Sequence, residues 1–498
     1  MFMFIFTLLL NVVTATLSSG FQATVTAAGV NKISSFVVPL IDDLVKNKTI
    51  TLPNIHIDTH VAEPIGHITI DLTNIQVSGL SLAALPVNVV PPSSFLLALD
   101  DLNLILNMGY KWRKVHWPHA SDHGTVNVVP QDVTGSIAVG VESNNSRPLL
   151  NNVKTSLSFG SFDIKFHGKV AWLYNLLMKT LKGKITDAIS NAFSGLIVKK
   201  VQAMNANFSK MQIHKTIGGG KSKIIVDLSF VNADVKPVKS GIVKSTQGNY
   251  ISFGLVMDVI SSASSERCDF AFQSPLPEQA PIGLGDTDLV QLVLGQRFFN
   301  CALEALNKQH ALDFLLMNKK LPPMLQSMGF LNTTKWCKAS PTLCQKYPNK
   351  LMQMEGTPHI NPEVNCSKVQ GCTLHYPLVL NTSVVNSGTN VSSHVFTLGI
   401  DLVFGGNLHI NNTGNVTVHA NVTSCKISVS VYDDPIPINA ASLQSNANLI
   451  SFLAKNLLNA VLKNGFPLPN APGLIKLVNA QLAVEDGYLT IASSIQMG

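Results

Sequence analysis

A row of large apolar side chains at successive four-residue steps constrains the fold more than any other feature of the chain. Residues 168–204 have the pattern of one long helix, and the row comprises Leu173, Leu177, Leu181, Ile185, Ile189, Phe193 and Ile197. Because an α-helix has about 3.6 residues per turn, each four-residue step drifts about 40° around the helix. A straight helix cannot bury such a row against one flat surface. We therefore expect this helix to bend near Gly183 or to lie along a curved wall.

The two halves of the chain carry the same ingredients in the same order. In the first half, a helical pattern at residues 30–44 and the long helix flank strands of period two, such as residues 67–72 and 223–228. In the second half, we expect a helix that begins at Asp286 as its N-cap and continues to Leu306, followed by strands at 395–404 and 416–431. A last helix at 446–464 precedes an alternating segment, residues 474–496. This order predicts elongated α+β domains in which curved antiparallel sheets surround long helices.

The expected helices are apolar over a wider arc than one sheet face needs. Two interpretations remain open on the pattern alone. Side chains fill each barrel completely, or a gap between helix and sheet holds hydrocarbon.

Composition favours an exported protein of two or three domains. The chain has 498 residues, 46% of them hydrophobic and only 13% charged. The one continuous apolar run, residues 2–13, is too short to span a bilayer. Its position and the small residues that follow predict a signal peptide over residues 1–20.

Glycosylation sequons and cysteines also indicate an oxidising, extracellular compartment. Sequons begin at Asn47, Asn144, Asn207, Asn332, Asn365, Asn381, Asn390, Asn411, Asn415 and Asn421. In one extended strand, Asn411, Asn415 and Asn421 would face the same side. The close pairs Cys337/Cys344 and Cys366/Cys372 predict two local disulfides, and their spacing is poor for zinc. The pairing of Cys268, Cys301 and Cys425 stays open, with at least one thiol left over.

Charge is divided unevenly along the chain. Residues 1–267 carry 23 Lys and Arg against 16 Asp and Glu, whereas residues 268–498 carry 13 of each. Either this is drift between two ordinary surfaces, or the first half faces an anionic partner.

Several segments together resemble the family of bactericidal/permeability-increasing, lipopolysaccharide-binding, phospholipid-transfer and cholesteryl ester transfer proteins. The closing stretch from Asn448 contains an NGFPLP turn before the last strands, and FDIKFHGKVAWLYNLL is similar to the entry into the family's long helix. The opening GFQATVTAAGVNKISSF and the later PIGLGDTDLVQLVL match in order.

The resemblance implies two tubular barrels joined by a central sheet in a boomerang shape, with lipid between helix and sheet. It divides the chain into a basic lipid-binding barrel at 21–267, a Pro-containing linker at 268–284 and a neutral, glycosylated barrel at 285–498 with a Cys-containing insertion at 331–377. The candidate pocket residues are Val37, Leu40, Leu173, Leu177, Leu181, Ile185, Phe299, Leu303, Leu449, Leu453 and Leu457.

The resemblance also implies head-group recognition at the tip of the first barrel. Lys111, Arg113 and Lys114 stand at the family's basic positions, and Trp112 or Trp117 would sit at a membrane interface. The chain departs from the family pattern after Lys114, where histidines replace further cations, and in lacking any cysteine in the first half. The partners implied are phospholipids or other amphipathic lipids, lipopolysaccharide and anionic membranes.

No catalytic motif is present in the sequence. It has no G-x-S-x-G elbow, no H-E-x-x-H and no dinucleotide fingerprint. We therefore expect a non-enzymatic protein without a cofactor, and we also expect a monomer that binds no nucleic acid. We expect no metal site, because His116, His119 and His123 lack a recurring carboxylate or cysteine partner at suitable spacing. The alternative is a structural or interaction glycoprotein with solid barrels.

Overall fold

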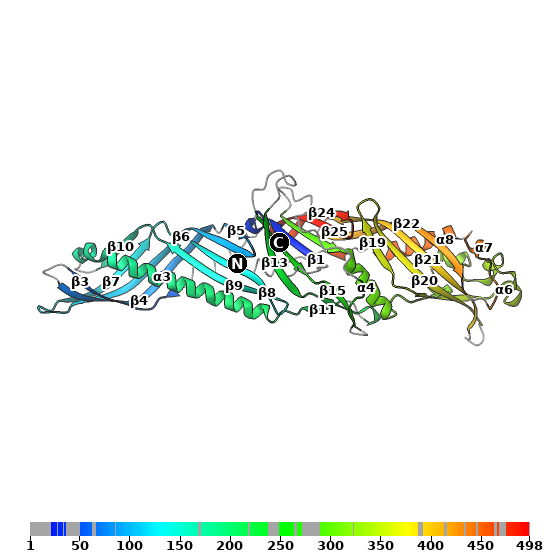
Figure 1. Cartoon of the computed structure of the whole chain (residues 1–498), viewed down its shortest axis with the longest axis horizontal. Coiled ribbons are helices and arrows are strands. Elements are labelled where there is room, and N and C mark those ends of the chain that lie inside the picture. Colours follow the sequence, from blue (N-terminus) through cyan, green and yellow to red (C-terminus); the bar gives the residue numbers. More distant parts are fainter. Residues whose placement is uncertain are drawn as a thin grey trace.

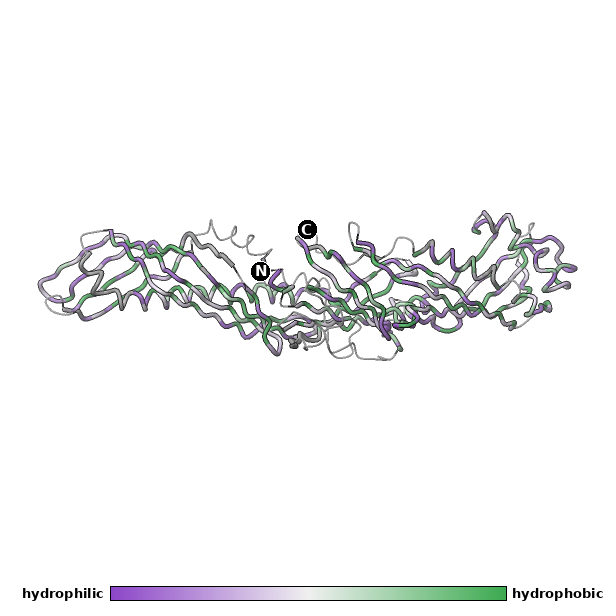
Figure 2. Tube along the Cα trace, turned by 90° about the horizontal axis from the view of Figure 1, so that it is seen from above, coloured by the Kyte–Doolittle hydropathy of each residue, from purple (hydrophilic) through white to green (hydrophobic). Residues whose placement is uncertain are grey.

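The molecule is long and narrow, with a curved sheet at each end and a smaller sheet shared between them (Figure 1). Figure 2 shows that it is bowed, with both ends displaced to the same side of the centre. The computed structural model describes residues 21–26, 28–32, 34–35, 50–61, 66–84, 86–167, 171–217, 220–237, 249–262, 266–270, 289–321, 323–386, 392–412, 416–432, 435–444, 447–462, 466–467 and 475–497. The expected signal peptide, Val37, Leu40, Asn47, Asn390, Asn415 and most of the linker lie outside these residues.

The central sheet takes strands from both halves of the chain. Its order is β13 (Phe230–Pro237), β14 (Asn249–Leu255), β1 (Phe21–Thr26), β16 (Val290–Gly295), β25 (Tyr488–Met497) and β24 (Ile475–Glu485). Thr24 of β1 pairs with Ser252 on one side and with Gln291 on the other. The two halves are therefore joined by a continuous hydrogen-bonded sheet.

The expected helix is wrong over residues 290–295, and its expected N-cap, Asp286, lies outside the described residues. Leu292 and Val293 lie in strand β16, and helix α4 (Gln296–Lys308) begins only after Gly295. Five of the six residues of β16 are buried, so the strand has no polar face to produce an alternating pattern. Such a run cannot be distinguished from a buried helix by periodicity.

The sheet of the first half is antiparallel and folds round the long helix. Its main path is β10 (Phe162–His167), β7 (Ser121–Pro130), β6 (Ser94–Lys114), β4 (Gly66–Ala84) and β2 (Ile50–Thr51). Four further strands attach to it, namely β3 (Ile55–Val61), β5 (Val87–Val90), β8 (Thr134–Asn144) and β9 (Arg147–Ser158). A small sheet of β11 (His214–Ile217), β12 (Ile224–Asp227) and β15 (Asp258–Ser261) follows.

Helix α3 (Ala171–Phe208) runs along this sheet from its outer end towards the central sheet (Figure 1). Ile185 and Ile189 belong to the hydrophobic core of the outer end. Further along the same row, Phe193 and Ile197 pack against a second core that includes residues of the central sheet. The described part of the row therefore follows the sheet from one core to the next, as its four-residue step predicts, whereas the side chains of Leu173, Leu177 and Leu181 lie outside the described residues.

The second half has the same plan with a shorter helix. Its sheet runs β17 (Phe314–Met317), β18 (Met352–Pro358), β20 (Gly371–Val385), β21 (Ser392–Asn411), β22 (Thr417–Val431) and β23 (Phe466–Pro467), with β19 (Glu363–Ser367) paired to β20. Helix α8 (Ala447–Leu462) packs on it through Ala454, Leu458 and Leu462. The short helices are α5 (Pro323–Ser327), α6 (Pro341–Lys346) and α7 (Ala440–Gln444), and the 3-10 turns are η1 (Gly220–Ser222), η2 (Asn318–Lys320) and η3 (Thr333–Trp336).

Asn411 and Asn421 do not share a strand, contrary to the expectation from their parity. Asn411 ends β21 and Asn421 lies in β22, which returns alongside it. Both side chains are exposed. Among the other described sequons, Asn332 is half-buried and the rest are exposed, namely Asn144, Asn207, Asn365 and Asn381.

None of the helices in the described ranges is both long and apolar enough to cross a bilayer. In α3, charged side chains interrupt every stretch of that length, as at Lys182, Lys184 and Asp187.

Candidate functional site

The outer end of the first sheet carries an ordered array of polar side chains, which we call the tip face. It consists of three cross-strand rows, because residues paired between neighbouring strands project from the same side. The first row is His56, Asp71, Lys111 and His123; the second is Asp58, Thr69, Arg113 and Ser121; the third is His60 and His67. The strands are β3, β4, β6 and β7.

Hydrogen bonds connect the tip face across its strands. His56 Nδ1 lies 2.6 Å from Asp71 Oδ1, and His67 Nε2 is hydrogen-bonded to Asp58 Oδ1. Arg113 Nε donates to Thr69 Oγ1 at 3.1 Å. Each acidic side chain of the face is therefore engaged by a histidine of the adjacent strand.

The fixed charges of the tip face cancel. The cations Lys111 and Arg113 are exposed, as sequence reasoning expects, but Asp58 and Asp71 project beside them. Sequence reasoning missed these two carboxylates because they lie about forty to fifty residues upstream and only strand register brings them here. The alternating polar positions of residues 55–60 and 67–72 are the signal that points to them.

The two candidate tryptophans have opposite surroundings. Trp112 is 7% exposed and belongs to the core of the outer end, because it alternates with the outward Lys111 and Arg113. Trp117, just beyond β6, is 84% exposed. Lys114 is half-buried at the end of its strand. Only Trp117 is therefore placed to meet a membrane interface in the way the sequence suggests.

Tyr110 lies in the interior behind the tip face. Tyr110 is buried, and its ring packs edge-on against Phe166. Burial, together with the nearby charge of Asp122, raises the pKa of Tyr110 above its ordinary value. The phenol therefore stays neutral across the physiological range.

The candidate pocket residues are only partly within the described structure. Ile185 is 2% exposed and lies in the core beneath the tip face. The backbones of Leu173, Leu177 and Leu181 belong to α3, and those of Leu449, Leu453 and Leu457 belong to α8. Their side-chain environments lie outside the description.

Phe299 and Leu303 are half-buried on α4, whose fully buried positions are largely polar. Gln296 Oε1 accepts from Cys366 N at 2.9 Å, and Asn300 Oδ1 accepts from Val364 N at 2.6 Å. Glu304 lies 2.7 Å from Lys308, and this contact raises the pKa of Lys308. Helix α4 is thus held by these polar contacts together with a small apolar cluster, to which Phe298, Ala305 and Leu306 belong.

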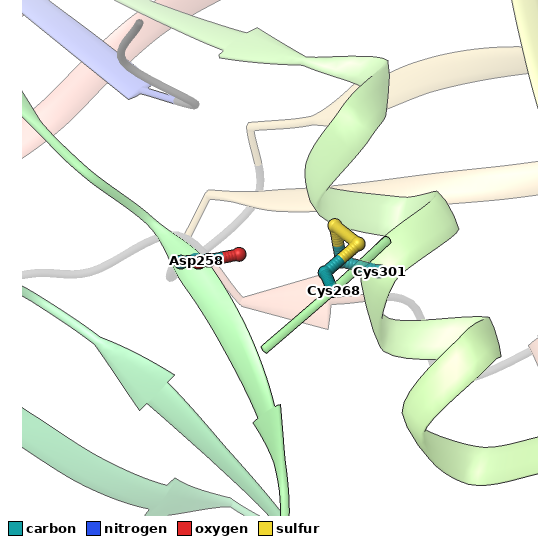
Figure 3. Close-up of side chains that lie close together, drawn as sticks. All are labelled: Asp258, Cys268 and Cys301. Carbon is teal, nitrogen blue, oxygen red and sulfur yellow. A yellow bond between two sulfur atoms is a disulfide. The ribbon is translucent and has the colours of Figure 1, made fainter. Parts of the chain in front are cut away.

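Three disulfides occur among the described residues. Cys337 pairs with Cys344, and Cys366 pairs with Cys372 directly across the β19–β20 ladder. The third, Cys268–Cys301, ties α4 to the segment after β15, and Asp258 lies beside it (Figure 3). Asp258 and these two sulfurs are close enough to suggest a metal site, but sulfurs joined to each other are not thiolate ligands. Cys425 is free, and burial raises the pKa of its thiol.

Two curved sheets, each with an apolar helix and joined through one central sheet, define a two-barrel tubular protein. Two family models match: the N-terminal domain of the LBP / BPI / CETP family over residues 41–211 and its C-terminal domain over residues 267–497. Together these models cover most of the chain. The chain therefore belongs to the LBP / BPI / CETP family.

Relatives and a solved structure agree with this assignment over at least nine-tenths of the chain. A bactericidal permeability-increasing protein of Sebastes schlegelii is 25% identical over 91% of this chain and 90% of its own length. A lipopolysaccharide-binding protein of Mus musculus is 23% identical over 90% of this chain and 88% of its own length. The crystal structure of a lipopolysaccharide binding protein matches with a TM-score of 0.55 at 19% identity, covering 97% of this chain and all of that one.

Proposed function

We propose that this protein is a secreted, non-enzymatic glycoprotein that binds and transfers lipids by holding phospholipid acyl chains in two apolar pockets. Family membership over both domains carries the proposal, together with relatives named for bactericidal and lipopolysaccharide-binding activity. Each pocket would lie between a long helix and its sheet. The disulfides and exposed sequons fit export.

The energetics favour hydrocarbon as the occupant of such a pocket. Each buried methylene group contributes about 0.8 kcal/mol, so two acyl chains outweigh several imperfect polar contacts. Helices α3 and α8 are each fixed to a strand by a polar contact near their C-terminal end, at Asn205 and Asn459. Among the described side chains, Ile185, Ile189, Phe193 and Ile197 of α3 and Ala454, Leu458 and Leu462 of α8 pack against apolar cores, and an acyl chain needs surface of this kind.

Transfer of labelled phospholipid between vesicles tests the proposal. Delipidated protein is mixed with donor vesicles that contain a self-quenched fluorescent phospholipid and with unlabelled acceptors. We expect fluorescence to rise in proportion to protein concentration. The alternative, a structural glycoprotein with barrels filled by side chains, predicts the same slow rise as vesicles alone.

We also propose that the tip face approaches anionic head groups, including those of lipopolysaccharide. Lys111 and Arg113 would contact phosphate, and Trp117 would enter the interface. Because Asp58 and Asp71 offset these cations, we expect the attraction to be weak and strongly dependent on salt.

Charge variants of the tip face test this second proposal. Lys111→Ala with Arg113→Ala should weaken binding to lipopolysaccharide or anionic vesicles by about threefold to tenfold at low salt. Asp71→Asn should strengthen binding, since it removes an opposing charge from the same row. Lys199→Ala with Lys200→Ala, exposed on α3, is the matched control. Equal effects of the two lysine-containing pairs would remove the tip face from the mechanism.

A further inference from the structure

Three histidine rings from different parts of the chain meet at the outer end of the tip face. His60 of β3 stands directly opposite His67 of β4, and their ring centres are 5.0 Å apart. Val115 N, just beyond β6, donates to the carbonyl of His67 at 2.8 Å. This bond brings His116 alongside, with its ring centre 5.7 Å from that of His67.

We propose that His60, His67 and His116 bind a divalent transition-metal ion, with zinc as the reference ion. Imidazole nitrogen is a preferred ligand of zinc, and three histidines leave a fourth tetrahedral position for water or an anion. With Zn–N bonds of about 2.0 Å, two imidazoles on one tetrahedral ion have ring centres about 5 Å apart. The His60–His67 and His67–His116 separations lie close to that spacing, although the donor nitrogens of the three rings do not all lie within 4.8 Å of one another.

Asp58 completes the arrangement by orienting the central histidine. It lies on the same face of β3 as His60, two residues earlier, and its Oδ1 is hydrogen-bonded to His67 Nε2. The Nδ1 atom of His67 is then the nitrogen left for the metal. A carboxylate that holds the second nitrogen of a ligating histidine fixes its tautomer and increases its basicity.

The ring nitrogens of the three histidines do not point towards a common position. Those of His60 and His67 are stacked with 16° between their planes, so coordination requires rotation of the side chains. His60 and His116 are exposed, and His67 is 24% exposed, so little packing opposes that rotation. The sequence alone does not reveal this trio. It suggests a local group of His116, His119 and His123, whereas the structure places His116 beside His60 of β3 and His67 of β4.

The charges around the trio permit a cation. Arg113, Lys111 and Lys114 lie on or beside the tip face, but Asp58 and Asp71 offset two of them, and His56 is occupied by Asp71. One of these three positive charges is left without an opposing carboxylate, so the affinity for a metal ion must come from the imidazole nitrogens rather than from the surrounding charge.

Calorimetric titration of the full-length chain with zinc chloride tests the proposal. The protein carries no polyhistidine tag, has been treated with a chelator and is kept at neutral pH. We expect one zinc ion per chain. His60→Ala, His67→Ala and His116→Ala should each weaken affinity by about tenfold or more. Asp58→Asn should weaken it by about tenfold, as is typical of a residue that orients a ligand.

Two exposed histidines supply matched controls. His119 lies in the same segment as His116, and His310 is far along the chain and paired with Asp313. The control variants are His119→Ala and His310→Ala. Both should keep wild-type affinity within about twofold. Circular dichroism checks that every variant is folded. Absence of zinc binding by the wild type would overturn the proposal, and so would unchanged affinity in His60→Ala and His116→Ala.

Discussion

Three asparagine side chains each make two hydrogen bonds to the backbone of a single strand residue, accepting from its N–H and donating to its C=O. Asn205 of α3 accepts from Leu150 N and donates to Leu150 O, both at 2.8 Å. Asn459 of α8 does the same with Val422 at 2.7 and 3.0 Å. Asn412 holds Ala480 in the same way. Each side chain thereby provides hydrogen-bond partners for the backbone N–H and C=O of a strand residue, at a position where a helix or loop takes the place of a neighbouring strand.

Asn459→Ala should reduce the free energy of unfolding by about 1–3 kcal/mol, because Val422 is buried and its N–H and C=O lose their partners. Asn205→Ala should behave in the same way in the first half. Asn459→Asp keeps an acceptor for Val422 N but sets a carboxylate oxygen against Val422 O, so it should not restore the stability of the wild type. Chemical denaturation followed by circular dichroism measures these differences.

Gln202→Ala, an exposed change on α3, controls for the substitution itself. A loss in Asn459→Ala no larger than that in Gln202→Ala would mean that the carboxamide contacts add nothing to stability.

Single residues could be placed from the sequence only where the pattern is local. The expectation that Trp112 could sit at a membrane interface is wrong, because it alternates with the outward Lys111 and Arg113 and therefore turns inward. The partners of Lys111 could not be identified, because Asp71 and His123 reach it through strand register rather than proximity in the chain. The same applies to Asn205 and Asn459, whose strand partners depend on packing.

Helix α3 is the element whose sequence described its own surroundings best. The apolar row predicts a curved wall, and its described members, Ile185, Ile189, Phe193 and Ile197, contact two successive cores. Strand β16 is the opposite case, since burial on both sides removes the alternation that identifies a strand. The sequence therefore predicts elements that have one solvent-exposed face better than elements that are buried on both sides.

Gly183→Ala should stabilise α3. This glycine is exposed, and an added Cβ would meet no atom within 4 Å. Alanine is favoured over glycine within a helix by about 1 kcal/mol, so the melting temperature should rise. Gly371→Ala is the contrasting change, because Gly371 has φ of +72° and its added Cβ would meet Gly406 O at 3.0 Å. A lower melting temperature for Gly183→Ala would mean that the helix needs the glycine to bend.

At the scale of the whole molecule, the central sheet makes the two halves one body. Strand β1 lies between β14 of the first half and β16 of the second, and the last two strands of the chain complete the sheet. The resemblance stated from sequence motifs predicts this two-barrel arrangement, and family membership confirms it. The sequence pattern alone could not decide what fills each barrel, because an apolar helix face suits side chains and hydrocarbon equally.

The count of lipids per chain tests the central claim most directly. Protein secreted from cells and purified without detergent is examined by native mass spectrometry, and its bound lipids are extracted and identified. Two pockets predict a main species that carries two phospholipid molecules, and delipidated protein should return to that state with phospholipid vesicles. Protein that is lipid-free as isolated, and remains so after incubation with the vesicles, would contradict the account.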